Sequence, residues 1–393
     1  MSGGAVLNEQ GEVVAVHGRS DEQAITEKSQ SKIITGIGTT IYSAAQRMLA
    51  VGVDLGVNLP SINVAAASKA DDFYIKANDK YSKNDYTGAI ADYSEAIRLN
   101  PNYAEAYLYR GTTRSDLGDK QGAIADYNAA LKINPNYALA YNNRGFARYE
   151  LGDKQGAIAD LNAALKINPN YALAYNNRGI ARSDLGDKEG AIADYNVALK
   201  INPNFDLPYY NLGIARYDLG DKEGAIADYN VALKINPNFD LAYNNRGFVR
   251  YELGDNQRAI AELNAALKIN PNYALAYNNR GIARYDLGDK QGAIADYNVA
   301  LKINPNFDLP YYNLGIARSD LGDKQGAIAD YNAALKINPN YAYAYYRRGT
   351  TRYDLGEKGE AIVDLQKAAE LLRQEGNAEW YQNALELIRK YQQ

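Results

Sequence analysis

The sequence predicts an all-α solenoid assembled from stacked helix–turn–helix units, and three repeating features support this fold class. An asparagine–proline pair recurs at a fixed spacing of 34 residues, at Pro101, Pro135, Pro169, Pro203, Pro237, Pro271, Pro305 and Pro339. Within each period, apolar or small residues recur at helical spacing, and in seven of the nine units a Leu-Gly-Asp triplet separates two helical runs. A fixed period of this size is typical of proteins in which each unit buries its apolar face only against its neighbours.

The first 67 residues lie outside the repeats and contain the only convincing β pattern of the sequence. Short apolar runs at residues 5–8 and 12–17 flank Glu9-Gln10-Gly11, which is typical of two strands joined by a tight glycine turn. Two strands alone are marginally stable in water, so this hairpin needs a partner. Residues 20–67 show no clear period, and we expect a mixed or poorly ordered connection there.

Nine units follow when each proline is counted as position 32 of its unit. The units are residues 70–103, 104–137, 138–171, 172–205, 206–239, 240–273, 274–307, 308–341 and 342–375. Glycine at position 15 supplies the backbone freedom that ends the first helix (helix A), as at Gly118. Aspartate at position 16, such as Asp119, can cap the second helix (helix B). Helix B then ends at the asparagine–proline pair, because the residue before proline avoids the α region.

The last unit departs from this pattern at its end. Arg373 replaces the proline at position 32, so the second helix can run on to Glu375. Residues 376–393 then predict a terminal helix with one apolar face, formed by Trp380, Ala384, Leu387, Ile388 and Tyr391. Such a helix caps the last repeat and turns its polar face to solvent.

Composition narrows the possible functions. The net charge is −4, with 43 basic and 47 acidic residues, which does not favour nucleic acid or an anionic membrane as partner. The chain has no cysteine and one histidine, His17, so we expect no metal and no cofactor. The most apolar window, residues 33–59, contains Arg47 and Asp54 and is a poor membrane span. No signal peptide is visible, and we expect a soluble, by default cytoplasmic, protein.

The units resemble the tetratricopeptide repeat over residues 70–375. Position 20 is alanine in every unit, and position 8 is glycine from Gly111 to Gly349, so that helices A and B can cross closely. The resemblance implies a right-handed superhelical solenoid that acts as a scaffold or adaptor and binds a protein or peptide segment in a concave groove. In this family the A helices line the groove, chiefly through positions 2, 5, 9, 12 and 13.

These positions give a candidate peptide-binding groove in the present chain. It comprises Asn142, Phe146, Tyr149, Glu150, Asn176, Ile180, Asp184, Tyr210, Ile214, Tyr217, Asp218, Asn244, Phe248, Tyr251, Glu252, Asn278, Ile282, Tyr285, Asp286, Tyr312 and Asp320. Asparagine amides can hold a peptide backbone, tyrosines add contact area at little entropy cost, and carboxylates pair with Lys or Arg. We therefore expect a partner with basic and apolar side chains.

Two rows of arginine have two possible interpretations. Position 11 is arginine in eight units and position 7 in six, one turn apart on helix A, while position 23 of helix B is acidic throughout. The arginines could form a phosphate- or RNA-binding ladder. Because each unit supplies a matching carboxylate, we predict instead a structural pairing between helices A and B, as for Arg216 with Asp228.

The amino terminus carries a second resemblance. Ser2-Gly3-Gly4, followed by the two apolar runs, resembles the segment around the nucleophile of trypsin-like serine peptidases. Ser2 would be the nucleophile, but the family's catalytic histidine and aspartate lie upstream of the serine, and no complete triad is present. We interpret residues 1–67 as a peptidase remnant plus linker and expect no catalysis. Two alternatives remain: the carboxyl-terminal part of a peptidase–repeat fusion, and self-association through exposed tyrosines.

Overall fold

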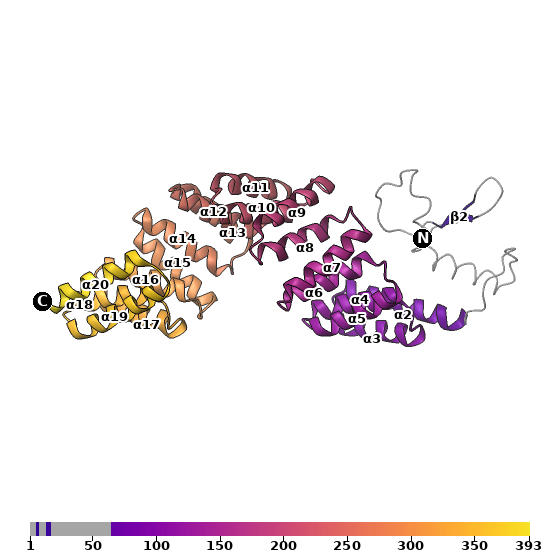
Figure 1. The fold of residues 1–393 in the computed structure, drawn as a ribbon, viewed down its shortest axis with the longest axis horizontal. Coiled ribbons are helices and arrows are strands. Elements are labelled where there is room, and N and C mark those ends of the chain that lie inside the picture. Colours follow the sequence, from indigo (N-terminus) through magenta and orange to yellow (C-terminus); the bar gives the residue numbers. More distant parts are fainter. Residues whose placement is uncertain (1–4, 8–12, 17–63) are drawn as a thin grey trace. The chain divides into compact units, whose positions relative to one another are not determined.

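The computed structural model describes residues 5–7, 13–16 and 64–393, which form one β-hairpin and nineteen α-helices (Figure 1). Strands β1 (Ala5–Leu7) and β2 (Val13–Val16) pair antiparallel, with Ala5 opposite Val16. The helices succeed one another as helix–turn–helix pairs. This arrangement confirms the predicted all-α solenoid and its short amino-terminal hairpin.

Each repeat contributes one helix A and one helix B. The A helices are α2 (Val64–Ser82), α4 (Ala104–Asp116), α6 (Ala138–Glu150), α8 (Ala172–Ser183), α10 (Asp206–Asp218), α12 (Asp240–Glu252), α14 (Ala274–Asp286), α16 (Asp308–Asp320) and α18 (Ala342–Asp354). The B helices are α3 (Tyr86–Leu99), α5 (Lys120–Ile133), α7 (Lys154–Ile167), α9 (Lys188–Ile201), α11 (Lys222–Ile235), α13 (Asn256–Ile269), α15 (Lys290–Ile303), α17 (Lys324–Ile337) and α19 (Lys358–Gln374). The terminal helix α20 (Ala378–Gln392) packs against α19.

The turn between helix A and helix B depends on its glycine and its aspartate. Gly118 has a φ of +88°, a region that glycine enters without strain. The carboxylate of Asp119 accepts a hydrogen bond from the amide of Gly122 at 2.9 Å and thereby caps α5. Both features recur along the chain, so successive helix pairs start with the same geometry.

Helix B ends at the asparagine–proline pair. The backbone of Asn134 is extended, with a φ of −124°, and its N–H donates to the carbonyl of Ala130 at 2.8 Å, so that α5 stops before Pro135. Helix α19 lacks this proline and has 17 residues, against 14 in α5. The length of helix B is therefore set by the position of the proline.

The small residues at position 8 allow helix A to cross its own helix B closely. A Cβ atom added at Gly213 would lie 2.5 Å from Cε1 of Tyr229, and a Cβ at Gly281 would lie 2.5 Å from Cε1 of Tyr297. Tyr229 and Tyr297 are almost fully buried and fill the space beneath these glycines. The predicted close crossing of the two helices is thus confirmed, and the tyrosine ring is what occupies the gap.

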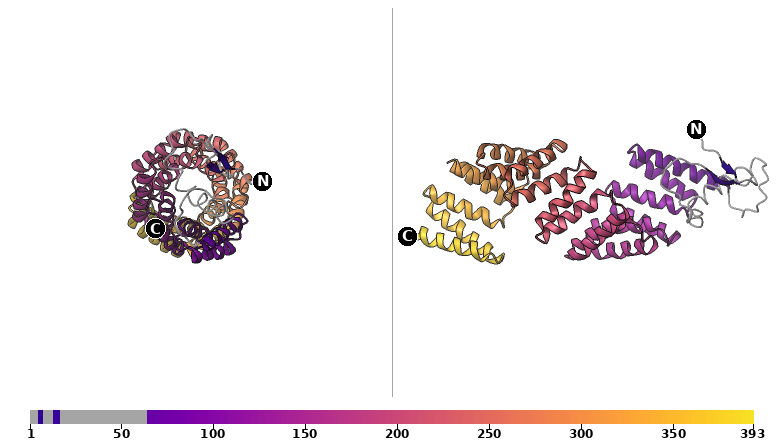
Figure 2. Two further views of the ribbon diagram at one scale, coloured as in Figure 1. Left: turned by 90° about the vertical axis from the view of Figure 1, so that its right-hand side faces the viewer. Right: turned by 90° about the horizontal axis from the view of Figure 1, so that it is seen from above.

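The chain divides into two compact units, Met1–Pro169 and Asn170–Gln393. Within each unit, consecutive helices lie side by side as antiparallel hairpins, from violet to magenta in the first and from magenta to yellow in the second (Figures 1 and 2). The core is built from buried alanines of both helices and from the tyrosine or leucine at position 24. Each repeat therefore adds its own layer of core.

The first A helix begins earlier than the repeat pattern indicated. Helix α2 starts at Val64, inside the segment that sequence analysis assigned to the linker, and so has 19 residues, against 13 in α4. The run of alanines at residues 65–67 has high helix propensity and extends the helix backwards. The expected connection over residues 20–63 lies outside the described residues.

Candidate functional site

One stripe of each helix A carries the candidate binding residues. Positions 2, 5, 6, 9, 12 and 13 recur at the spacing of a helical face, and we call this surface the A-helix face. In the unit Asn170–Gln393, helices α12, α14, α16 and α18 contact one another in order, so their A-helix faces are neighbours. The structure allows each predicted position on this face to be judged by its exposure and its partners.

The asparagines at position 5 do not face a ligand. Asn142, Asn176, Asn244 and Asn278 are 1–2% exposed, and the prediction that their amides hold a peptide backbone is wrong for this reason. Burial of an amide is costly unless it is hydrogen-bonded. These side chains must therefore find partners within the protein.

Their partners are the asparagines at position 6 of neighbouring repeats. Asn279 Nδ2 donates to Asn244 Oδ1 at 3.0 Å, and Asn313 Nδ2 donates to Asn278 Oδ1 at 3.0 Å. The position 5 amide donates in turn to its neighbour in the chain, as from Asn244 to Asn245 at 3.1 Å. The asparagines thus form an amide ladder that links repeat to repeat.

The tyrosines at position 5 also bridge repeats. Tyr210 packs against Phe239, with 4.8 Å between ring centroids, and its hydroxyl accepts a hydrogen bond from Asn245 Nδ2 at 3.2 Å. Tyr312 packs in the same way against Tyr341, at 4.9 Å. Burial raises the pKa of both phenols. Both rings therefore pack against the end of their own repeat, and the hydroxyl of Tyr210 reaches the next repeat, so that neither tyrosine contributes much to an open surface.

The acidic residues at position 13 are exposed, but lysines of the preceding repeat pair with most of them. Lys at position 17 forms ion pairs with Glu150 at 2.6 Å, with Asp218 at 2.5 Å, with Glu252 at 3.2 Å and with Asp320 at 3.2 Å. These lysines leave less negative charge for a basic ligand than the sequence indicated. Sequence analysis did not match the repeating lysine with these carboxylates.

The tyrosines at position 12 bind the same carboxylates. Tyr251 Oη donates to Asp286 Oδ2 at 2.8 Å, and Tyr285 Oη donates to Asp320 Oδ2. Burial, and then the hydrogen bond to Asp286, raise the pKa of Tyr251 to about 12. Each such pair joins helix A of one repeat to helix A of the next.

Asp286 differs from Glu252 and Asp320 because no lysine pairs with its carboxylate. The preceding repeat has Asn256 at position 17 where the other paired repeats have lysine, and Asp286 forms no ion pair with any described residue. Its carboxylate keeps only the hydroxyl of Tyr251 as a hydrogen-bond partner among the described residues. The exposed negative charge of Asp286 is therefore uncompensated.

The apolar part of the A-helix face has two columns. The predicted residues at position 9 are partly exposed or exposed: Phe146, Ile180, Ile214, Phe248 and Ile282. Sequence analysis named position 2 but not the leucines that occupy it, which are 37–40% exposed: Leu173, Leu207, Leu241, Leu275 and Leu309. Positions 2 and 9 lie two helical turns apart, and this spacing could have identified the leucines.

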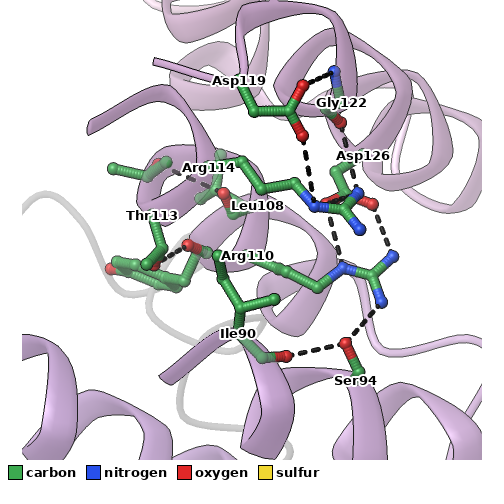
Figure 3. Close-up of polar contacts among 11 residues, drawn as sticks. Ile90, Ser94, Leu108, Arg110, Thr113, Arg114, Asp119, Gly122 and Asp126 are labelled. Atoms are coloured by element: carbon green, nitrogen blue, oxygen red, sulfur yellow. Dashed lines mark hydrogen bonds and ion pairs between the residues drawn. The ribbon is translucent and has the colours of Figure 1, made fainter. Parts of the chain in front are cut away.

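The arginine rows have the predicted structural role. Arg110 Nε and Nη2 donate to both carboxylate oxygens of Asp126, at 2.9 and 2.6 Å, and Arg114 Nη1 donates to Oδ2 at 2.8 Å (Figure 3). Arg110 also donates to Ser94 Oγ of the preceding helix B at 3.0 Å and lies over the ring of Tyr107. The same pairing recurs at Asp160, Asp194, Asp296 and Asp364. These arginines are engaged inside the stack.

The residues of the peptidase resemblance cannot be placed. Ser2, Gly3, Gly4 and His17 lie outside the described residues, so the peptidase remnant stays a prediction.

Of the described helices, none is long and apolar enough to cross a bilayer. Residues 64–393 bring together no group of three or more His, Asp and Glu side chains that could hold a metal ion.

Comparison with known proteins gives matches along the repeats. Family models described as "TPR repeat" match residues 77–118, 114–152, 147–186, 182–220, 215–254, 249–288, 283–322 and 317–356. A model described as "Tetratricopeptide repeat" matches residues 342–374. No curated protein matches the chain.

Solved structures show the same architecture. The chain is similar to a structure of the Cut9–Hcn1 hetero-tetramer of APC/C, at 16% identity over 90% of this chain and 81% of that one, with a TM-score of 0.56. A tetratricopeptide repeat protein from Parabacteroides merdae matches at 22% identity over 64% of this chain and 99% of that one, with a TM-score of 0.52. MamA matches at 30% identity over 41% of this chain and 94% of its own, with a TM-score of 0.38.

Proposed function

Because this chain belongs to the tetratricopeptide repeat family, we propose that it is a protein-interaction scaffold without catalytic activity. In this proposal it binds a segment of another protein along the A-helix face of residues 170–393. The proposal rests on the family for the class of function and on the exposed side chains of this face for the site.

The leucine column at position 2 is the observation that carries the choice of surface. Leu173, Leu207, Leu241, Leu275 and Leu309 recur once per repeat, and each exposes more than a third of its side chain. Exposed apolar side chains that gather on one face mark interaction surfaces more often than leucines scattered singly. The partly exposed isoleucines at position 9 lie on the same helical stripe and widen the apolar strip.

The chemistry of the face indicates a partner that is mainly apolar, with few basic groups. The position 5 asparagines are buried, and the carboxylates of Asp218, Glu252 and Asp320 already have lysine partners. A segment with one apolar side chain for each repeat would bury the leucines. The bound segment needs a basic residue only where it meets a carboxylate that has no lysine partner.

A pair of matched triple variants tests the surface. Twelve-residue peptides are selected from a phage-displayed library on the full chain, and their affinities are measured by fluorescence anisotropy. We expect Leu207→Ser, Leu241→Ser and Leu275→Ser, combined in one variant, to weaken binding at least tenfold, since apolar area is lost at three sites. The control combines Leu219→Ser, Leu253→Ser and Leu287→Ser, which changes exposed leucines at the A–B turns of the same repeats.

Two results would count against the proposal. Failure to enrich any peptide would contradict a peptide-binding function. Equal losses in both triple variants would show that binding does not use the A-helix face.

A further inference from the structure

The repeats hold a lysine ammonium in a recurring setting. Lys290 Nζ lies 5.7 Å from the ring centroid of Tyr285, at position 12 of its own repeat, and 3.2 Å from Oδ2 of Asp320, at position 13 of the next. Lys358 lies at the same distance, 5.7 Å, from the ring of Tyr353. An aromatic face and a carboxylate therefore form a setting that suits a primary ammonium group.

Two repeats have this setting but lack the lysine. In the repeat 70–103, Tyr81 donates to Asp116 at 2.7 Å, but position 17 is Tyr86, whose ring packs on that of Tyr81 at 5.5 Å. The repeat 240–273 has no such ring at position 17. Tyr251 is at position 12 of the repeat 240–273, and its hydroxyl donates to Asp286 of the next repeat at 2.8 Å. Position 17 is Asn256, which is too short and uncharged to replace the ammonium. Asp286 consequently forms no ion pair with any described residue, although it is exposed.

Two further observations support a site for an external group. Phe248 lies beside Tyr251, with 6.5 Å between ring centroids, and Tyr217 meets Phe248 edge-on at 6.0 Å, so the carboxylate adjoins an aromatic cluster. Asn256 Oδ1 is buried and accepts no hydrogen bond. Asn256 therefore offers no charged donor in place of the lysine ammonium of the other paired repeats.

We propose that Tyr251, Asp286 and Asn256 form a subsite that binds the side-chain ammonium of a lysine in the bound protein segment. This inference rests on the proposed function and specifies which basic group the segment carries. The lysine of the ligand stands where Lys290 stands in the following repeat, with its alkyl chain along Phe248 and its charge at Asp286. The neighbouring acidic positions already have their own lysines, so this subsite fixes the register of the segment.

The test compares peptide binding by the wild-type chain, which has Asn256 at position 17, with binding by a variant that has lysine there. Three libraries of 12-residue peptides with randomised flanks carry lysine, acetyl-lysine or glutamate at a fixed central position. We expect the wild-type chain to prefer the lysine library over the acetyl-lysine library by about tenfold, as for a charge-assisted contact on an aromatic face. In Asn256→Lys, an internal lysine can occupy the setting, and the preference should disappear while binding of the acetyl-lysine library remains.

Matched variants separate this effect from net charge and from unfolding. Gln257→Lys adds the same charge at the next, exposed residue and should keep the lysine preference. Asp286→Asn should lose the preference without adding a charge. Conversely, Lys222→Asn frees Glu252 beside Tyr217 and should add a preference for a second lysine. Thermal melting curves confirm that each variant is folded.

The outcomes distinguish the two proposals. A lysine preference that survives in Asn256→Lys and in Asp286→Asn overturns the subsite and leaves the scaffold function intact. Equal binding of the three libraries by the wild-type chain also overturns the subsite and leaves the scaffold function intact. Absence of binding to any library overturns both, because the subsite presupposes a bound segment.

Discussion

Arg216 alone pairs with the buried carboxylate of Asp228, with 3.1 Å between Nη1 and Oδ2; among the described residues Asp228 has no other ion pair. In six repeats two arginines surround this carboxylate position, but here Leu212 replaces the arginine at position 7. Leu314 makes the same replacement beside Asp330 and Arg318. Burial, opposed by the single arginine, raises the pKa of Asp228 and of Asp330 to about 6.

These two aspartates should make stability depend on pH in an unusual direction. Their pKa in the folded chain is above the ordinary value of 3.8, so the folded state binds the proton more readily than the unfolded state. Their contribution is stabilising below pH 4 and is lost as the pH rises through about 6. We expect Leu212→Arg with Leu314→Arg to remove this loss and to raise the unfolding free energy at pH 7.5 by about 1 kcal/mol per site.

Urea unfolding followed by circular dichroism between pH 4 and pH 8 measures this effect. The informative quantity is the difference between the double variant and the wild-type chain, since other carboxylates titrate equally in both. A difference that does not change across pH 4–7 would contradict the assignment.

Shortening Glu262 should stabilise the chain. Glu262 is the only glutamate at position 23 among the nine repeats, and the Nε atoms of Arg246 and Arg250 beside it are buried without hydrogen-bond partners. In Glu262→Asp we expect Arg246 to pair with the shorter carboxylate through two hydrogen bonds, as Arg280 pairs with Asp296 in the next repeat. This should add about 1 kcal/mol to the free energy of unfolding in chemical denaturation. The reverse change, Asp296→Glu, should lower stability by a similar amount.

Adding one methyl group at a crossing point should be costly. In Gly213→Ala the new Cβ would lie 2.5 Å from the ring of Tyr229, so the helices must separate, at a cost of about 1–3 kcal/mol. Gly359→Ala is the matched control, because a Cβ at this helical glycine meets nothing within 4 Å. It should be neutral or slightly stabilising in thermal unfolding. Equal losses in both variants would show that backbone effects, and not the crossing, decide the outcome.

The amide ladder should matter for stability and not for binding. Asn244→Ala leaves the Nδ2 of Asn279 without its acceptor in a buried position, at a cost of about 1–3 kcal/mol. Gln325→Ala, at an exposed site on α17, should be neutral. Peptides selected on the wild-type chain should bind folded Asn244→Ala with unchanged affinity; a specific loss of affinity would restore Asn244 to the binding surface.

The fold was largely predictable from the sequence, because its determinants are local and repeated nine times. Gly118, Asp119 and Pro135 each act within a few residues of their own position, and their spacing determines where helices begin and end. The pairing of Arg110 with Asp126 was predictable for a different reason: six repeats supply both partners at the same two positions. The early start of α2 at Val64 was missed, because the repeat period places the start of the first unit at Ala70.

The candidate site was less predictable, because exposure depends on the neighbouring repeat. Asn244 has the same local sequence whether it faces a ligand or Asn279, and only the placement of the next helix A distinguishes the two. The same holds for Asp320, whose lysine partner lies 30 residues earlier in the chain. Residues with partners in the next repeat are those for which single-repeat reasoning fails.

The contacts between repeats have a consequence for how the length of this protein can change. Residues 138–239 and 240–341 are near-copies, and both begin with an A helix that ends in glutamate at position 13. Deleting residues 138–239 would place Glu252 where Glu150 now accepts Lys120, and Asn245 where Asn143 now donates to Thr112. The junction would keep its ion pair and its hydrogen bond. Recombination between the copies can thus remove or insert three repeats in a single genetic event without exposing an unmatched interface.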